Sequence, residues 1–174
     1  MRSVRDVANR ETIKSIYYAL CQSIITYCIT CWGSAAKTFM IQVERAQRSV
    51  LKTMLRKPYK YSTDKLYKEA DVLSVRKLYV LKSTLLTHRK ILSAPEDFKY
   101  LRDKRVYRVN MPVVNTAFAQ RHGLFAKAFA YNRVAMHCSI KNRKICEVRN
   151  IVSNWLASLS YGELENYLDL NRLN

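Results

Sequence analysis

Glycine and proline are scarce in this sequence, with three of each among 174 residues. A β-sandwich or a Rossmann-type fold needs more glycines than this for its tight turns, so the composition disfavours both. Hydrophobic residues still make up 49% of the chain, which is enough apolar surface to stabilise a packed core. The sequence therefore favours a globular, mainly α-helical fold.

Long apolar runs are also missing. No stretch reaches the roughly 18 uninterrupted apolar residues that a membrane-spanning helix needs. The first ten residues, MRSVRDVANR, lack the apolar segment of a secretory signal. We therefore expect no membrane partner and an intracellular location, nuclear or cytoplasmic. The odd number of five cysteines fits free thiols in such a location better than a disulfide framework.

Acidic residues are few compared with basic ones. The 31 lysines and arginines outnumber the 13 acidic residues, which gives a net charge of +18. Such a surplus repels itself unless an anionic partner is bound, and nucleic acid is the leading candidate for that partner. An anionic membrane surface would supply the same counter-charge. However, the basic residues are spread over several predicted helices and do not form one amphipathic segment.

The residues that usually carry catalysis are missing as well. No two aspartates are adjacent, and Glu163 and Glu165 lie two residues apart on a predicted helix, where side chains diverge. There is no P-loop, no dinucleotide-binding glycine motif, no serine-hydrolase elbow and no H-E-x-x-H motif. His88 and His122 have no partner nearby in the sequence and are interpreted as solvated or structural. We therefore predict no catalytic residue, no cofactor and no enzyme activity for this chain alone.

Apolar residues recur at steps of three and four along most of the chain, which predicts amphipathic helices. A first helix runs from Glu11 to Trp32, and Gly33 ends it because glycine tolerates the left-handed conformation. The predicted buried face of this helix contains Ile13, Ile16, Tyr17, Leu20, Cys21, Ile24, Tyr27, Cys28 and Cys31. A second helix ends at Pro58. Its predicted buried face contains Phe39, Val43, Ala46, Val50 and Met54, with Gln47 and Leu51 at the margin.

Further helices are predicted over residues 64–70, 73–92 and 140–159. The inner faces of the longer two contain Leu78, Leu81, Leu85 and Leu92, and Ile145, Val148, Val152, Trp155 and Leu159. In residues 117–137 a helix is only slightly favoured over a strand. Residues 105–114 alternate and carry β-branched side chains, which indicates a short strand or an extended arm. Ser160 and Glu163 fit a capping box that begins a last short helix.

These elements predict a compact, mainly α-helical bundle of about five to seven helices. A short β-hairpin or an extended arm near residues 105–114 is the only exception expected. Residues 95–116 are the best candidate for a hinge, which divides the chain into a helical region at residues 1–94 and a second one at residues 117–174.

Cys28 and Cys31, in the segment YCITCWG, have the C-x-x-C spacing of zinc and redox sites. A zinc site would have to add ligands from His137, Cys138 or Cys146. Side chains 137 and 138 point apart, and the spacing departs from the usual ligand pairs. A thioredoxin-like pair opens a helix after a strand, whereas this pair closes a helix. We therefore predict no metal site and interpret the cysteines of the first helix as small buried apolar side chains.

Four cations on the second predicted helix lie opposite its apolar face, with only Glu44 nearby. Arg45, Arg48, Lys52 and Arg56 follow one another at helical spacing. Like charges on one helix face cost a few tenths of a kcal/mol per pair, which a bound polyanion would relieve. A second predicted nucleic-acid-binding set consists of Arg143, Lys144 and Arg149. A basic stripe is most often only a solvated face, so the total charge, and not any single residue, favours nucleic-acid binding.

Three stretches in this order carry a family pattern: IYYALCQSIITYCITCWGSA, VERAQRSVLKTML and YSTDKLYKEADVLSVRKLYVLK. The first follows L-Y-x-A-L-x-x-S-x-x-x-Y-G-x-x-x-W-G through Tyr17, Ala19, Leu20, Ser23, Tyr27, Trp32 and Gly33. The second contributes Gln47 and Leu51 near a Q-x-R-x-x-R helix, and the third contributes Leu66, Tyr67, Glu69, Leu73 and Val75. Together they resemble the region after the polymerase core in reverse transcriptases of non-LTR, jockey-like retrotransposons. Cys28 is a departure, because the family has glycine there.

The resemblance implies that residues 1–94 are thumb-like. The family's catalytic aspartates, a pair in a Y/F-x-D-D motif and a third upstream, have no counterpart here. The resemblance therefore implies a C-terminal fragment of an RNA-directed DNA polymerase of a mobile element that does not polymerise alone. Its implied role is to hold RNA or DNA through the phosphates, independently of sequence. The alternative hypothesis is a basic helical protein-interaction module with no nucleic-acid role.

Overall fold

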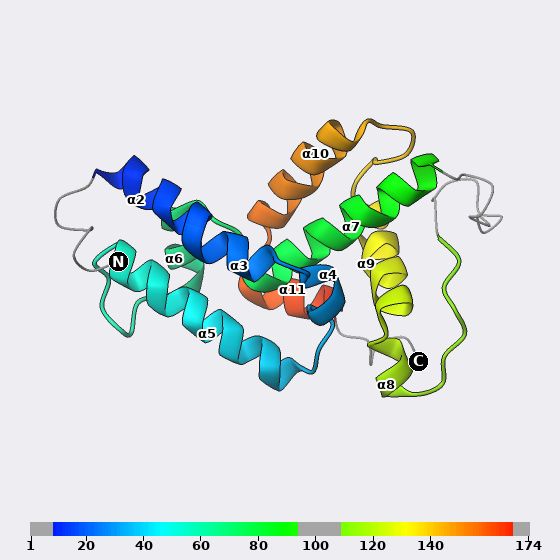
Figure 1. Cartoon of the computed structure of the whole chain (residues 1–174), viewed down its shortest axis with the longest axis horizontal. Coiled ribbons are helices and arrows are strands. Elements are labelled where there is room, and N and C mark those ends of the chain that lie inside the picture. Colours follow the sequence, from blue (N-terminus) through cyan, green and yellow to red (C-terminus); the bar gives the residue numbers. More distant parts are fainter. Residues whose placement is uncertain (1–8, 94–108, 169–174) are drawn as a thin grey trace.

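The computed structural model describes residues 9–93 and 109–168, and these residues form a mainly α-helical bundle, as predicted. The N-terminal part contains α2 (Arg10–Ile16), the π-helical turn η1 (Tyr17–Gln22), α3 (Ser23–Thr26), α4 (Ile29–Trp32), α5 (Lys37–Met54) and α6 (Thr63–Ala70). The remaining helices are α7 (Val75–Ser93), α8 (Ala117–Gln120), α9 (Gly123–His137), α10 (Ile145–Ser158) and α11 (Tyr161–Leu168). Figure 1 shows α2, α5 and α6 toward one end of the molecule, α8 and α9 toward the other, and α3 and α4 between them.

Helix α7 is the centre of the fold. It packs chiefly against α9 and α10, which lie on either side of it in Figure 1. Every side chain from Val75 to Leu81 is buried, so neighbours enclose the first half of the helix on all sides. Leu78, Leu81 and Leu85 point inward as predicted. The prediction was wrong for Leu92, which is 48% exposed near the end of the helix.

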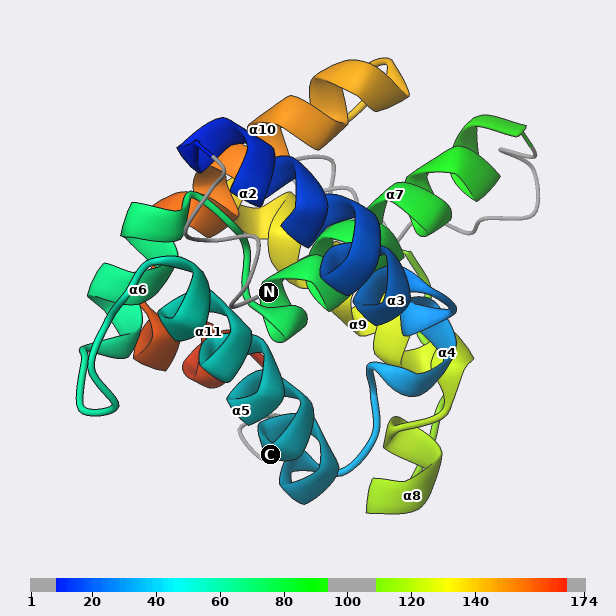
Figure 2. The same cartoon turned by 60° about the vertical axis from the view of Figure 1, so that its left-hand side comes forward.

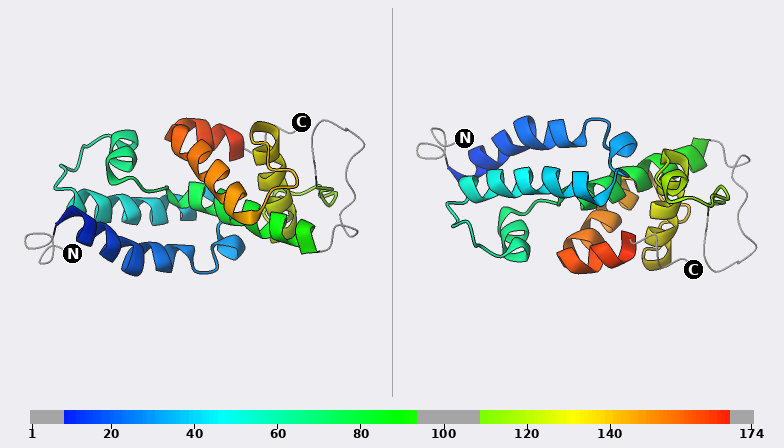
Figure 3. Two further views of the ribbon diagram at one scale, coloured as in Figure 1. Left: turned by 90° about the horizontal axis from the view of Figure 1, so that it is seen from above. Right: turned by 90° about the horizontal axis from the view of Figure 1, so that it is seen from below.

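Two clusters of buried apolar side chains stabilise the bundle. The larger one surrounds α7 and takes residues from α4, α5, α9, α10 and α11. The smaller one lies between α2, η1, α5 and α6, around Tyr17, Leu51 and Leu66. Figure 3 shows that α5 lies alongside the N-terminal helices while α7 continues toward α9. Helix α5 therefore contributes to both clusters.

The first predicted helix is broken in two places, and its predicted buried face is only partly buried. Residues 17–22 form a π-helical turn, and the helix ends at Thr26 and restarts at Ile29. Three side chains of the predicted buried face, those of Leu20, Ile24 and Tyr27, are 61%, 74% and 77% exposed. The prediction failed because each π or non-helical residue rotates the following side chains away from the face that the 3.6-residue period assigns to them.

The break at Cys28 is a left-handed residue with a φ of 48°. The indole nitrogen of Trp32 donates a hydrogen bond of 2.8 Å to the carbonyl oxygen of Tyr27, which closes the turn. Gly33 was predicted to be the left-handed residue, but its φ is −68°. A Cβ atom at Gly33 would lie 2.3 Å from Cδ2 of Tyr79, so this glycine is needed for close packing against α7.

Cys28→Gly should stabilise the protein by about 1 kcal/mol, because a side chain in the left-handed region costs about that much and glycine removes the cost. Chemical denaturation of the variant and the wild type measures the difference. The matched control is Cys31→Gly, three residues away inside α4, which should lose a few tenths of a kcal/mol through helix propensity. If Cys28→Gly and Cys31→Gly lost the same amount of stability, the left-handed backbone at Cys28 would not be strained.

The predicted strand or arm at residues 105–114 is described only from residue 109 onward. Residues 110–116 form neither helix nor strand. Asn132 of α9 holds the start of this segment, because its amide accepts from the backbone nitrogen of Val109 at 2.7 Å and donates to the Val109 carbonyl oxygen at 2.8 Å. A side-chain amide thus satisfies both backbone polar groups of Val109, which is a β-bridge residue. Residues 105–108 lie outside the described residues.

The predicted capping box at the last helix is confirmed. The backbone nitrogen of Ser160 donates to Oε2 of Glu163 at 2.6 Å, and the Glu163 nitrogen donates to Oγ of Ser160 at 3.2 Å. The helix predicted over residues 117–137 is present as α8 and α9, and the one predicted from residue 140 begins only at Ile145. None of the described helices has the length and apolar character to cross a bilayer.

Candidate nucleic-acid interface

The inner face of α5 is rotated by about one residue relative to the prediction. Its buried residues are Met40, Glu44, Gln47, Leu51 and Met54. Phe39, predicted to be buried, is 64% exposed, and Ala46 is exposed as well. The prediction was wrong because it placed only apolar side chains inward, whereas Glu44 and Gln47 have polar partners inside the fold. This rotation decides which of the predicted cations face solvent.

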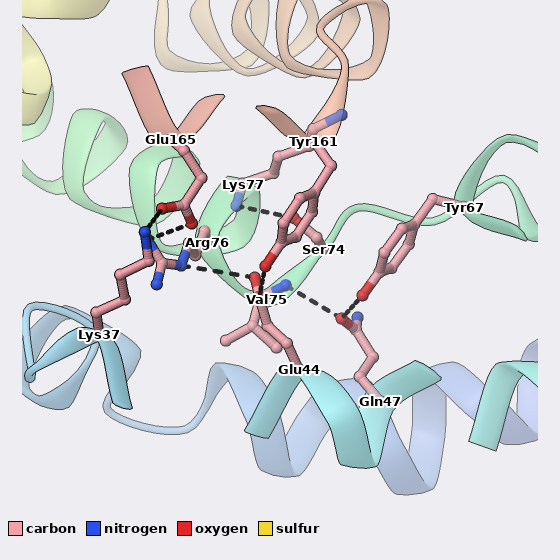
Figure 4. Close-up of polar contacts among 10 residues, drawn as sticks. All are labelled: Lys37, Glu44, Gln47, Tyr67, Ser74, Val75, Arg76, Lys77, Tyr161 and Glu165. Carbon is pink, nitrogen blue, oxygen red and sulfur yellow. Dashed lines mark hydrogen bonds and ion pairs between the residues drawn. The ribbon is translucent and has the colours of Figure 1, made fainter. Parts of the chain in front are cut away.

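Glu44 was the only acidic residue expected near the basic stripe, and it is fully buried. It accepts a hydrogen bond from the hydroxyl of Tyr161 on α11, and one of its oxygens lies 3.8 Å from Nε of Arg76 (Figure 4). Burial, together with this hydrogen bond, raises the pKa of Tyr161 to about 12, so the hydroxyl keeps its proton. The carboxylate is therefore directed into the core and does not neutralise the stripe.

Arg76 and Glu165 extend this buried network toward the start of α5. NH1 of Arg76 lies 2.6 Å from a carboxylate oxygen of Glu165, whose other oxygen lies 2.8 Å from Nζ of Lys37 (Figure 4). The network connects α5, α7 and α11 through charges that, except for the exposed Lys37, are largely removed from water. Because breaking a buried ion pair leaves an unpaired charge, these contacts fix the position of α5 against the rest of the bundle.

The four predicted cations of α5 have different surroundings. Arg45 is exposed, and the Arg48 guanidinium is half-buried over the ring of Tyr161, 5.9 Å from its centroid. The Lys52 ammonium group donates a hydrogen bond to the carbonyl oxygen of Tyr59. Among the described residues, no ion pair joins Arg45, Arg48 or Lys52 to a carboxylate. These charges are therefore available to an external anion.

Arg56 lies beyond α5 and not on it as predicted. The helix ends at Met54, and Arg56 is left-handed, with a φ of 55°. The backbone nitrogen of Lys57 donates to the carbonyl oxygen of Lys52 at 2.9 Å, which is the bond of a Schellman helix end. Pro58 follows, in the position where proline often stops a helix. The exposed Arg56 side chain thus extends the stripe from the helix into the next loop.

The second predicted set, Arg143, Lys144 and Arg149, is on a different part of the surface. Arg143 precedes α10 and pairs with Glu147 at 3.5 Å, and Lys144 is the N-cap of the helix. Arg149 is exposed on the helix itself. Figure 2 shows α10 and α5 on opposite sides of the bundle. The structure therefore does not bring the two predicted sets together.

The loop between α5 and α6 contains a group of aromatic and basic side chains that the predicted site did not include. Tyr59 is 90% exposed, and the Lys52 ammonium group lies 5.2 Å from the centroid of its ring. Lys57 lies 4.9 Å from the ring centroid of Tyr61. The sequence signal is the alternation of cations and tyrosines in RKPYKY, which is typical of single-strand nucleic-acid binding.

Glu69 of α6 holds this loop in place. Its carboxylate lies 2.8 Å from Nζ of Lys57 and accepts a hydrogen bond of 3.0 Å from the hydroxyl of Tyr61. The bond with Glu69 raises the pKa of Lys57, and the bond with Lys57 lowers the pKa of Glu69. A hollow of about 300 Å³ next to the loop is lined by Arg10, Lys14, Arg56 and Glu69 among others.

The candidate metal ligands do not converge. Within the described residues, no three histidine, cysteine or acidic side chains are placed to hold a metal ion. Cys28 and Cys31 are exposed, which corrects the prediction that they are buried, and Cys138 is buried. His137 instead stacks on Trp155 with ring centroids 5.5 Å apart. No site for a metal is built from the cysteines that the sequence singled out.

His88 is structural, as predicted. It is 2% exposed, with Nδ1 3.3 Å from the hydroxyl of Tyr131 and Nε2 2.9 Å from the carbonyl oxygen of Arg143. Both ring nitrogens are therefore occupied by contacts that join α7, α9 and the turn before α10. His122 is exposed at the start of α9.

Comparison of the chain with protein-family models, with curated proteins and with solved structures finds no match. The geometry of the site and the sequence patterns are therefore the basis for assigning a function.

Proposed function

We propose that this chain binds RNA or DNA through the phosphate backbone, without sequence preference and without catalysis of its own. The observation that carries the proposal is the arrangement of charge on α5. Arg45, Arg48 and Lys52 have no carboxylate partner among the described residues, and Glu44, the acidic residue on the same helix, faces the core. Phosphate contacts of this kind supply affinity that does not depend on base identity.

The resemblance to the C-terminal region of a jockey-like reverse transcriptase supports this role. Its three stretches meet at Gln47, which lies within hydrogen-bonding distance of Tyr17 from the first stretch and Tyr67 and Val75 from the third. Cys28, where that family has glycine, adopts the left-handed conformation that glycine favours. Both observations fit a chain whose ancestors had the family pattern, and we propose that it derives from such an enzyme and lacks the polymerase centre.

The test is a set of binding measurements at several salt concentrations. If roughly six phosphates are neutralised, log K against log salt should fall with a slope of about −4 to −5. Replacing Arg45, Arg48, Lys52 and Arg56 with glutamine should weaken binding more than about tenfold and reduce the slope by about three. The fold should persist, as circular dichroism and thermal unfolding would show.

The matched control removes four exposed cations elsewhere: Lys65→Gln, Lys68→Gln, Lys82→Gln and Arg89→Gln. This variant has the same net charge as the first but keeps the stripe, so it should retain most of the affinity. Equal loss in both variants would mean that total charge, and not the stripe, determines binding. A slope near zero for wild-type protein with both RNA and DNA would reject the proposed function.

The second candidate function is a protein-interaction module. The exposed apolar side chains of Leu20, Ile24 and Tyr27 favour it, because such a row on a helix is a common feature of protein interfaces. The stripe variant separates the two functions, since only nucleic-acid binding predicts that this variant loses affinity for a polynucleotide.

A further inference from the structure

The loop after α5 holds an aromatic ring in solvent on a well-fixed backbone. Tyr59 is 90% exposed, so its ring contributes little to the core. The backbone nitrogen of Tyr61 donates to the carbonyl oxygen of Pro58 at 3.1 Å, which closes a turn around Tyr59. Lys52 donates to the Tyr59 carbonyl oxygen from the last turn of α5. These bonds, and the fixed φ of Pro58, hold the ring outward with little loss of entropy on binding.

One cation lies against this ring, and two more are close to it along the chain. Lys52 lies 5.2 Å from the ring centroid, and the side chains of Arg56 and Lys60 are exposed within three residues of Tyr59 along the chain. Lys57, by contrast, is paired with Glu69 and serves to hold the loop. An exposed aromatic face next to exposed cations matches the two needs of a nucleotide, which are a stacking surface for the base and positive charge for the phosphate.

We infer that Tyr59 is a stacking platform for an unpaired base, so that this end of the stripe binds single-stranded RNA or DNA in preference to duplex. In a duplex the faces of the bases are covered by their neighbours, whereas in a single strand they are free to stack on an aromatic side chain. Lys52, Arg56 and Lys60 would contact the phosphates on either side of the stacked base. This inference rests on the proposed function and adds the strand form of the ligand.

The experiment measures binding of the full chain to a fluorescent 12-nucleotide oligo(U) and to a 12-base-pair duplex by fluorescence anisotropy. Tyr59→Ala should weaken oligo(U) binding about tenfold, which is within the range of one base stack, and should change duplex binding less than about twofold. Tyr59→Phe should bind as the wild type does, because it keeps the ring. The control Tyr27→Ala removes another exposed tyrosine, on a segment without charges, and should have no effect.

The salt dependence gives a second, independent readout. Stacking releases no counterions, so Tyr59→Ala should lower the affinity for oligo(U) at every salt concentration and leave the slope unchanged. Equal effects of Tyr59→Ala on oligo(U) and duplex, or no effect on either, would overturn the stacking platform and leave phosphate binding intact. Wild-type protein that binds neither ligand would overturn the proposed function itself.

Discussion

Gln47→Leu should destabilise the protein by about 3 to 5 kcal/mol, because it removes the side chain that joins four polar groups in the interior. Gln47 is 2% exposed, and Nε2 donates to the Tyr17 hydroxyl at 2.9 Å and to the Leu73 carbonyl oxygen at 3.0 Å. Oε1 accepts from the Tyr67 hydroxyl at 2.8 Å and from the Val75 nitrogen at 3.1 Å, and Figure 4 shows these last two contacts. The amide thus uses its full hydrogen-bonding capacity.

Leucine fills nearly the same volume as glutamine, so the loss measures unsatisfied polar groups and not a cavity. Urea denaturation gives the free energy of unfolding for each variant. Gln42→Leu is the control, since Gln42 is exposed on the same helix and its replacement should change the stability by less than about 0.5 kcal/mol. Similar values for the two leucine variants would show that the network around Gln47 does not stabilise the fold.

The sequence predicted best those helical features that depend on residues three or four positions apart. The capping box of Ser160 and Glu163 involves residues three apart, and its geometry was predicted correctly. The inward leucines of α7 repeat at helical spacing and are buried except for Leu92. Such patterns are visible in the sequence because the interacting residues are neighbours along the chain.

The buried polar residues of α5 were not predictable in the same way. Glu44 and Gln47 have partners on α6, α7, α11 and the loop before α7, which lie 20 or more residues away in the sequence. A burial rule based on residue type places glutamate and glutamine outside. Only the tertiary arrangement shows that polar groups from several distant segments contact one another here. The error of about one residue in the orientation of α5 follows from this.

The candidate site was partly visible in the sequence. Arg45, Arg48 and Lys52 lie on one side of α5, because residues spaced by three and four positions share a helix face. Arg56 follows the same spacing, but the Schellman end at Lys57 takes it off the helix. The exposure of Tyr59 depends on the turn at Pro58 and on the contact with Lys52. A periodic pattern in the sequence predicts neither the turn nor the contact. The sequence therefore predicted the basic side of the candidate site and missed its aromatic part.

Gly33→Ala should destabilise the protein by about 3 kcal/mol or more, because the new methyl group has no room. Its Cβ atom would lie 2.3 Å from Cδ2 of Tyr79 and 2.6 Å from the carbonyl oxygen of Ile29. The Tyr79 ring is 4% exposed, so it cannot move into solvent, and the Ile29 oxygen already accepts a hydrogen bond from the Gly33 nitrogen at 2.8 Å. Either the ring or the turn between α4 and α5 must shift, and thermal unfolding would record the loss.

Gly162→Ala is the matched control, since no atom lies within 4 Å of the position that its Cβ atom would take. This glycine is in the first turn of α11, where alanine should stabilise the protein by about 0.5 to 1 kcal/mol through helix propensity. Opposite signs for two Gly→Ala changes would separate the close contact from the general effect of the substitution. In a Tyr79→Ala background the cost of Gly33→Ala should fall, because the coupling energy of the pair reports the clash. An undiminished cost in that background would mean that the Ile29 carbonyl, and not the ring on α7, excludes a side chain at this position.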